Sequence, residues 1–420
     1  MAHIFGDRGS RVRFSLPVIL LGIAFPFIPP NILSGNRTVV GVSLVILGAL
    51  IAFIQDSNRI HGAPSAGRVI VLVTAASLWV STRAADPGST LQGAAVGLVV
   101  LACASIILSN GERARQAGRL FVLAVLVLCA SAAITLVLWR GLGIAPVLVT
   151  QFDIGTLAGN LYLPVTSSVG VQSAWGIQFP RFAGLGREPG WMSMYAALAW
   201  FIWPIVGKPR VVGRLLLAFG VLAPLSTAGF GIFVVAVAYE IFLVPRPASN
   251  VLVAYLRQLV GVAALAFAIW IAYFAPVFGL AAKSTQNTDS LVGRGESTQA
   301  GLQALLQLSL GYPSDVPAAN LNLVAAASEN GWPFFALILL ALVTPLIGLR
   351  GRQAAFPPLL TIALFLLAAQ PPGGSFGAFI MIILSCAVAA PREDAHVDLL
   401  GRNLIPDRLR RPQGDVVTRE

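Results

Sequence analysis

Residues 180–190 read Pro-Arg-Phe-Ala-Gly-Leu-Gly-Arg-Glu-Pro-Gly and concentrate charge in a chain of which only 11% of residues are charged. The segment holds two arginines, Arg181 and Arg187, and the carboxylate of Glu188, with apolar sequence on both sides. Arginine stays charged and can grip phosphate oxygens through paired hydrogen bonds. A neighbouring carboxylate can orient or deprotonate a hydroxyl group. Ionisable groups are costly beside an apolar membrane interior, so this cluster predicts a functional site.

The composition of the whole chain predicts an integral membrane protein. Of its 420 residues 57% are hydrophobic, and the mean hydropathy is +0.82. Apolar runs long enough to cross a bilayer recur along the sequence. We therefore expect an all-α fold, a polytopic transmembrane bundle of about twelve spans, in which two long outward loops contain short helices. The predicted spans are residues 14–30, 38–54, 69–82, 91–108, 120–138, 191–206, 215–228, 229–244, 258–278, 332–349, 356–369 and 376–390.

The chain is expected to form one transmembrane domain over residues 14–390, with an N-terminal tail at 1–13 and a basic C-terminal tail at 391–420. The long loops are predicted at 139–190 and 279–331. The apolar stretch at 215–244 is too long for one upright span, and the break at Ser226–Gly229 predicts two short helices that meet at a tight turn. The run Gln370-Pro-Pro-Gly-Gly predicts an outward turn.

The distribution of basic residues predicts the orientation. Of the 28 lysines and arginines, 21 fall in the two tails and in the loops on one side of the predicted spans. Basic loops stay in the cytoplasm, so both termini are expected there, and both long loops on the outer side. The net charge of +11 follows from this bias, and we expect membrane lipids as partners and no nucleic acid.

The second long loop carries Arg294, followed by a predicted helix at 298–310. Two arginines from separate outward loops suit a lipid diphosphate, on which negative charge develops when the glycosyl bond breaks. Structural alternatives stay open. Glu188 could simply begin a helix, Arg187 could pair with it or anchor at lipid headgroups, and Arg294 could be a headgroup contact.

Neither a metal site nor a cofactor site is expected. The three histidines lie in predicted cytoplasmic segments, and the three cysteines lie inside apolar runs. No phosphate-binding loop of the ATPase type is present in the sequence, which argues against ATP-driven transport.

Three segments resemble the O-antigen polymerase and O-antigen ligase superfamily of bacterial inner-membrane proteins. Arg181, Gly184, Glu188 and Pro189 resemble the family's R-x-x-G-x-x-x-E-P box before a central span. The stretch from Arg294 to Tyr312-Pro313 resembles its arginine-led periplasmic helix. Residues 320–331 resemble its closing segment, and the turn at 225–229 its serine- and glycine-rich turn.

This resemblance implies sugar transfer from undecaprenyl diphosphate at the periplasmic face, without a metal. Arg181 and Arg294 would hold the diphosphate, and Glu188 would be a structural or acid–base residue. The remaining residues expected to bind the substrate are Arg187, Tyr312, Asn320, Asn322 and Glu329. Expected partners are the lipid-linked glycan donor and acceptor, with a chain-length regulator and a repeat-unit flippase as further candidates.

One departure from the family pattern discriminates between its two activities. Ligases of this group have a histidine about nine residues before the closing glutamate, where this chain has Asn320. Asparagine binds hydroxyls but is not a base at neutral pH. The resemblance therefore favours a polymerase of repeat units, for O-antigen or another surface polysaccharide. Ligation of finished polymer to an acceptor stays an alternative, as does a transporter or lipid flippase without catalysis.

Overall fold

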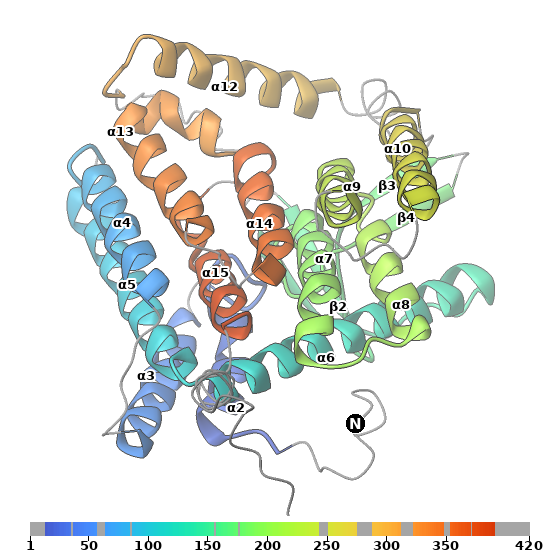
Figure 1. The fold of residues 1–420 in the computed structure, drawn as a ribbon, viewed down its shortest axis with the longest axis horizontal. Helices are drawn as coiled ribbons and strands as arrows, with labels where there is room; N and C mark the ends of the chain where they lie inside the picture. Colours follow the sequence, from blue (N-terminus) through green and yellow to red (C-terminus); the bar gives the residue numbers. More distant parts are fainter. Residues whose placement is uncertain are drawn as a thin grey trace, which may run out of the picture.

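The computed structural model describes residues 13–34, 37–56, 64–84, 86–154, 157–174, 177–242, 251–274, 288–311, 322–347, 353–370 and 372–390. Helices dominate these residues and form one bundle, with a small sheet against it (Figure 1).

The first half of the chain contributes one group of helical segments, which precedes the sheet. They are α2 (Leu16–Ala24), η1 (Phe25–Phe27), α3 (Thr38–Gln55), α4 (Pro64–Ser81), α5 (Pro87–Leu108), α6 (Gly111–Leu136) and the π-helical turn η2 (Val137–Gly141). The second group follows the sheet. It comprises α7 (Pro189–Val206), α8 (Val211–Leu222), α9 (Thr227–Phe242), α10 (Val251–Phe274), α12 (Thr288–Leu306), α13 (Leu323–Val343), η3 (Thr344–Leu346), η4 (Gln353–Ala355), α14 (Phe356–Ala368) and α15 (Phe376–Val388).

Each predicted apolar run contains a helix in the described residues. The predicted division of residues 215–244 into two helices is confirmed, because α8 ends at Leu222 and α9 begins at Thr227. The break lies at residues 223–226, earlier than the predicted turn at Ser226–Gly229, and Gly229 lies inside α9. Within the described ranges, four helical segments are long and apolar enough to cross a membrane, namely Thr38–Gln55, Pro87–Leu108, Gly111–Gly141 and Leu323–Leu346. This supports the prediction of a membrane protein, and twelve crossings would require the shorter apolar helices to cross as well.

The first long loop differs from its prediction, because it forms a sheet where short helices were expected. Strands β1 (Leu148–Ile154), β2 (Leu157–Tyr162), β3 (Thr166–Ala174) and β4 (Ile177–Phe182) pair in chain order as an antiparallel meander. The segment is rich in threonine, valine and serine, and β-branched residues favour strands. The fold is therefore mostly helical, and the all-α description is wrong for this loop.

A buried hydroxyl cluster fastens the sheet to the end of α6. The Thr166 hydroxyl lies 2.6 Å from that of Ser131 and 2.9 Å from that of Thr135. Ser131 also accepts a hydrogen bond from the backbone N–H of Val165 at 3.1 Å. These bonds satisfy polar groups that have no access to water, so the position of β3 on the bundle is fixed.

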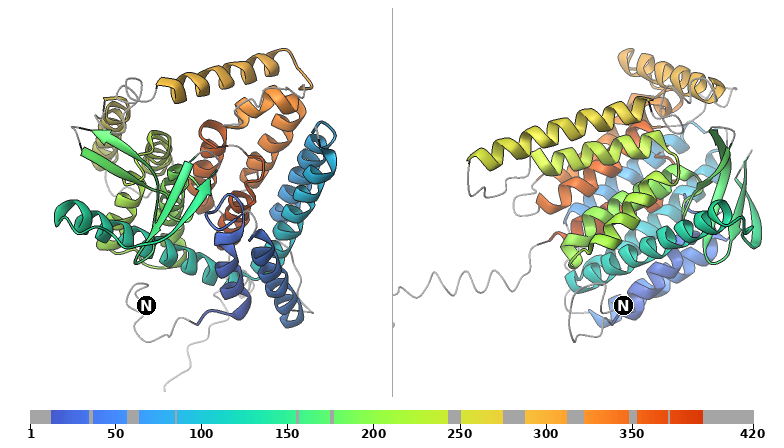
Figure 2. Two further views of the ribbon diagram at one scale, coloured as in Figure 1. Left: turned by 180° about the vertical axis from the view of Figure 1, so that it is seen from behind. Right: turned by 90° about the vertical axis from the view of Figure 1, so that its right-hand side faces the viewer.

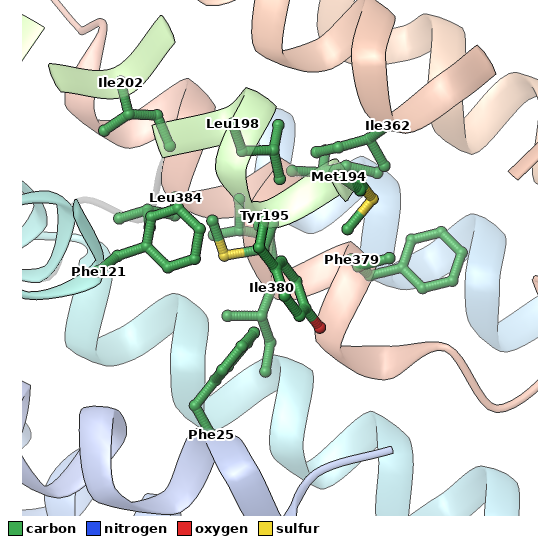
Figure 3. Close-up of a cluster of buried hydrophobic side chains, with 14 of the residues drawn as sticks. Phe25, Phe121, Met194, Tyr195, Leu198, Ile202, Ile362, Phe379, Ile380 and Leu384 are labelled. Carbon is green, nitrogen blue, oxygen red and sulfur yellow. The ribbon is translucent and has the colours of Figure 1, made fainter. Parts of the chain in front are cut away.

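Helix α7 is the centre of the bundle. Its side chains are buried along nearly the whole helix, and Trp191, Tyr195 and Trp203 are each 1% exposed. The Tyr195 ring packs edge-on against Phe25 and Phe121, with ring centroids 5.7 and 6.1 Å away (Figure 3). Because other helices surround α7, whatever precedes its first turn is positioned by the whole core.

Helix α12 is joined to the bundle by a close backbone approach. Gly311 and Gly331 have φ of +83° and +77°, and a Cβ at Gly311 would overlap the Glu329 carbonyl oxygen. Arg83 donates from Nη1 to the Gly311 carbonyl at 2.5 Å and lies over the ring of Trp79 at 4.6 Å. Figure 2 shows α12 and the sheet at the same end of the bundle.

We expect Gly311→Ala to destabilise the protein. A left-handed backbone alone costs a non-glycine residue roughly 1–3 kcal/mol, and the overlap with the Glu329 carbonyl adds to that cost. Gly295→Ala is the matched control, since a Cβ there meets nothing within 4 Å. Alanine is the better helix former by about 1 kcal/mol, so the control should be neutral or stabilising. Thermal unfolding of both variants in detergent would measure the difference, and equal midpoints would contradict the close approach.

Candidate functional site

The charged cluster lies where the sheet enters the central helix. Arg181 is the penultimate residue of β4 and is half-buried, between the buried side chains of Pro180 and Phe182. Arg187 is exposed, and Glu188 is half-buried at the residue before α7. The prediction that Glu188 and Pro189 begin a helix is confirmed, because Pro189 is the first residue of α7.

Three parts of the chain meet here in what we call the polar junction: residues 28–32, residues 183–190, and residue 370 with residues 372–377. Its backbone hydrogen bonds join Ile32 N–H to Leu185 O at 2.8 Å, Arg187 N–H to Pro30 O at 3.1 Å, and Gly377 N–H to Pro29 O at 2.9 Å. Below them, the Tyr195 hydroxyl donates to Asn31 Oδ1 at 2.6 Å, and Asn31 Nδ2 donates to Phe25 O at 2.7 Å. The junction holds the start of α7 from two other parts of the chain.

The Glu188 side chain is bound across this junction by Gln370. Gln370 Nε2 donates to Glu188 Oε2 at 2.6 Å, and the glutamine is 5% exposed. The Glu188 side chain makes no capping hydrogen bond to α7. A residue whose role was only to cap the helix would bond to the first N–H groups, so a capping role alone does not account for this carboxylate.

The two arginines of the cluster differ in their surroundings. The Arg187 side chain points into solvent, and the described residues contain no ion pair between it and Glu188. That removes the ion-pair alternative for Arg187, while the headgroup-anchor alternative stays open. The half-buried Arg181 is held on a strand that is paired with β3, which gives it the more restricted position.

The second arginine of the predicted pair lies on α12, since Arg294 falls within Thr288–Leu306. This helix starts earlier than the predicted 298–310 and confirms that the second long loop contains one. Figure 2 places α12 and the sheet at one end of the bundle, so the elements that carry Arg181 and Arg294 share that end. Tyr312 and Asn320 lie outside the described residues.

Asn322 and Glu329 lie on the first turns of α13. Among the described residues, neither forms a hydrogen bond with Glu188. Asn322 caps the helix, accepting from Ala325 N–H at 2.8 Å and donating to Thr298 Oγ1 at 3.2 Å. This capping role accounts for the hydrogen bonds of the Asn322 side chain. Glu329 is half-buried beside the Gly311–Gly331 approach, where its carboxylate faces no described hydrogen-bond partner.

Other charged residues at this end have structural roles. Arg140 bonds to the carbonyl of Gln178 and lies 4.8 Å from the centroid of the Trp139 ring. Asp86 caps α5, and hydrogen bonds from Ser89, its side chain first and then its backbone, lower the pKa of this carboxyl group. Neither residue is a catalytic candidate.

A cavity of about 560 Å³ adjoins the polar junction. Its walls come from the 28–29 segment, α4, the first half of α5, Phe334 of α13, and the turn between α14 and α15. The lining is mostly apolar, with a few hydroxyl and amide groups such as Ser89, Thr90 and Gln92. Gly373 and Gly374 belong to the same turn as Gln370, so one short segment both binds Glu188 and bounds the cavity.

Gln370 was not among the predicted site residues, although the sequence around it did indicate a turn. The Gln-Pro-Pro-Gly-Gly run predicted a turn, and the described residues around it do form the connection between α14 and α15. Nothing local in the sequence indicates its partner, which is 182 positions away.

The described residues contain no group of three or more His, Cys, Asp or Glu side chains that could hold a metal ion. A mechanism without a metal stays a prediction. Among the described residues, the arrangement offers the half-buried Arg181 and one oriented carboxylate. A fixed cation can stabilise an anionic leaving group, and a carboxylate can accept a proton.

No family model matches this chain, and no match was found among the curated proteins.

Proposed function

We propose that this protein is a polysaccharide polymerase of the bacterial inner membrane. It would join oligosaccharide repeat units, carried on undecaprenyl diphosphate, at the periplasmic face and without a metal. The observation that carries the proposal is the Glu188 carboxylate, which is held by the buried Gln370 in the segment that also contains the half-buried Arg181 and the exposed Arg187.

The proposed reaction uses these groups in one step. An acceptor sugar hydroxyl attacks the anomeric carbon of the donor, forming the glycosidic bond. The bond from that carbon to the phosphate oxygen breaks, and the diphosphate leaves with the electron pair. Arg181 and Arg294 would stabilise the charge on this leaving group, and Glu188 would accept the proton of the attacking hydroxyl.

The location of the groups supports a membrane-linked substrate. A lipid diphosphate has an apolar chain and a charged head, so its site needs both an apolar wall and fixed cations. The apolar cavity bounded by Gly373 and Gly374 lies against the polar junction that carries Arg187 and Glu188. In the proposed topology of twelve crossings, both termini are cytoplasmic and this junction faces the periplasm.

Cysteine accessibility tests the proposed topology. In a variant whose three native cysteines are replaced, Arg187→Cys should react with a membrane-impermeant maleimide in intact cells, because this exposed position would face outward. Lys208→Cys, exposed at the opposite end of α7, should react only after the membrane is permeabilised. The reverse pattern would invert the orientation and remove the periplasmic assignment.

Deletion of the gene in its own host should leave single repeat units on the lipid carrier. A polymerase is needed to join such units, whereas loss of a ligase would leave long polymer on the carrier. Lipid extraction followed by gel or mass analysis of the released glycan separates the two. Unchanged surface polysaccharide with no lipid-linked intermediate would contradict both.

Arg181→Ala and Arg294→Ala should each lower chain elongation by roughly 100-fold or more, since each removes a fixed cation from the developing charge. Lysine at either position should restore little, because it cannot form the paired hydrogen bonds of arginine. Arg140→Ala is the control, an exposed arginine at the same end with a structural contact to Gln178. Polymer of normal length and amount in both alanine variants would reject the assignment.

A further inference from the structure

We propose that Gln370 is a positioning residue that holds Glu188 in the orientation needed to accept the proton of the attacking hydroxyl. The inference rests on the proposed function, and it assigns to Gln370 a role that the sequence motifs do not suggest.

Packing at the end of α14 fixes the position of Gln370, and Gln370 in turn fixes that of Glu188. Gln370 follows the last turn of α14, and its backbone N–H bonds to Phe365 O at 3.1 Å. Phe365 is fully buried, with its ring 5.0 Å from that of Trp191 on α7. The 5% exposed amide of Gln370 is therefore carried by a packed helix end, and not by a mobile surface side chain.

The single hydrogen bond makes the two oxygens of the Glu188 carboxylate different from each other. Gln370 Nε2 donates to Oε2 of Glu188 at 2.6 Å. The other oxygen, Oε1, makes no hydrogen bond within the described part of the chain and can receive a proton from a substrate. The bond to Oε2 thus fixes one oxygen of the carboxylate and leaves the other facing a substrate.

The chemistry of the amide suits this role better than a cation would. A lysine or arginine in place of Gln370 would form an ion pair and hold the carboxylate charge against protonation. The amide is uncharged at every physiological pH and offers two N–H donors. It orients Glu188 while leaving the carboxylate able to gain and lose a proton.

The competing role is a structural clamp that fastens α14 to the start of α7. Both roles predict that loss of the Gln370 amide lowers polymer formation, so a single substitution does not distinguish them. Exchanging the two residues does, because Glu188→Gln with Gln370→Glu keeps one amide-to-carboxylate hydrogen bond. A clamp would work equally well in either direction, whereas a proton acceptor must stay at position 188.

The test uses a strain without the chromosomal gene that expresses single and double variants of the full chain, with its own lipid-linked repeat units as the probe. Polymer per unit of membrane-inserted protein and the unfolding midpoint in detergent are measured for each. Gln370→Met keeps the side-chain volume and removes the donor. Thr361→Val is the matched control, since it removes another buried side-chain hydrogen bond of α14, from Thr361 Oγ1 to Pro357 O, without touching Glu188.

We expect Gln370→Met to make about 10- to 100-fold less polymer, a loss typical of a displaced reacting group. Thr361→Val should keep its polymer even where its midpoint falls. The exchanged double variant should recover the midpoint lost in Glu188→Gln but make no polymer. Normal polymer from Gln370→Met, or from the exchanged variant, would overturn the inference. Normal polymer from Glu188→Gln alone would instead remove the proposed function of Glu188, so the two failures are distinguishable.

Discussion

Polar groups at helix ends inside an apolar bundle must find partners within the protein, and the polar junction is where this protein meets that constraint. The first residues of α7, Pro189 and Gly190, are buried. The 28–32 segment supplies backbone partners to Leu185 and Arg187 just before them. That segment is bonded in turn by Gly377 N–H and, through Asn31, by the Tyr195 hydroxyl. The position of Glu188 follows from this arrangement. Its carboxylate is placed by two segments that have no functional motif of their own, and the core around α7 makes that placement rigid.

Much of the helical architecture could be predicted because its signals are local. The apolar runs, the break before Thr227 and the start of α7 at Pro189 each depend on a few neighbouring residues. The sheet could not be predicted by the same search. Residues 148–182 are apolar enough to suggest contact with a membrane, but their alternation of β-branched and small residues was a strand signal that a search for helical spans passes over. The bond from Gln370 to Glu188 could not be predicted at all, because it exists only once α14 packs against α7.

The two arginines proposed to share a diphosphate are held in different ways. Arg181 is on a strand that is paired with β3, and β3 is fastened to α6 through Thr166. Arg294 is on α12, which is connected to the bundle by the close approach of Gly311 and Gly331. The first support consists of hydrogen bonds to a buried helix, and the second of backbone packing at glycines that no other residue could replace without strain. The proposed site, if assembled from both, would depend on α12 keeping its angle, and the close approach of Gly311 and Gly331 would then matter for function as well as for folding.

The distribution of charge along the helices bears on the choice between catalysis and transport. Helices α3, α5, α7, α14 and α15 contain no charged residue. The ion pair of Arg113 with Asp56 lies where α3 ends and α6 begins, at the end of the bundle opposite the sheet. Transporters commonly place charges or broken helices near the middle of the membrane, where the substrate must pass. Here Arg181, Arg187 and Glu188 lie at the sheet end, next to a cavity with an apolar lining. A substrate with its chain in the membrane and its charged head at the surface would meet these groups without crossing the bundle, and a step confined to one face is what chain elongation on a lipid carrier requires.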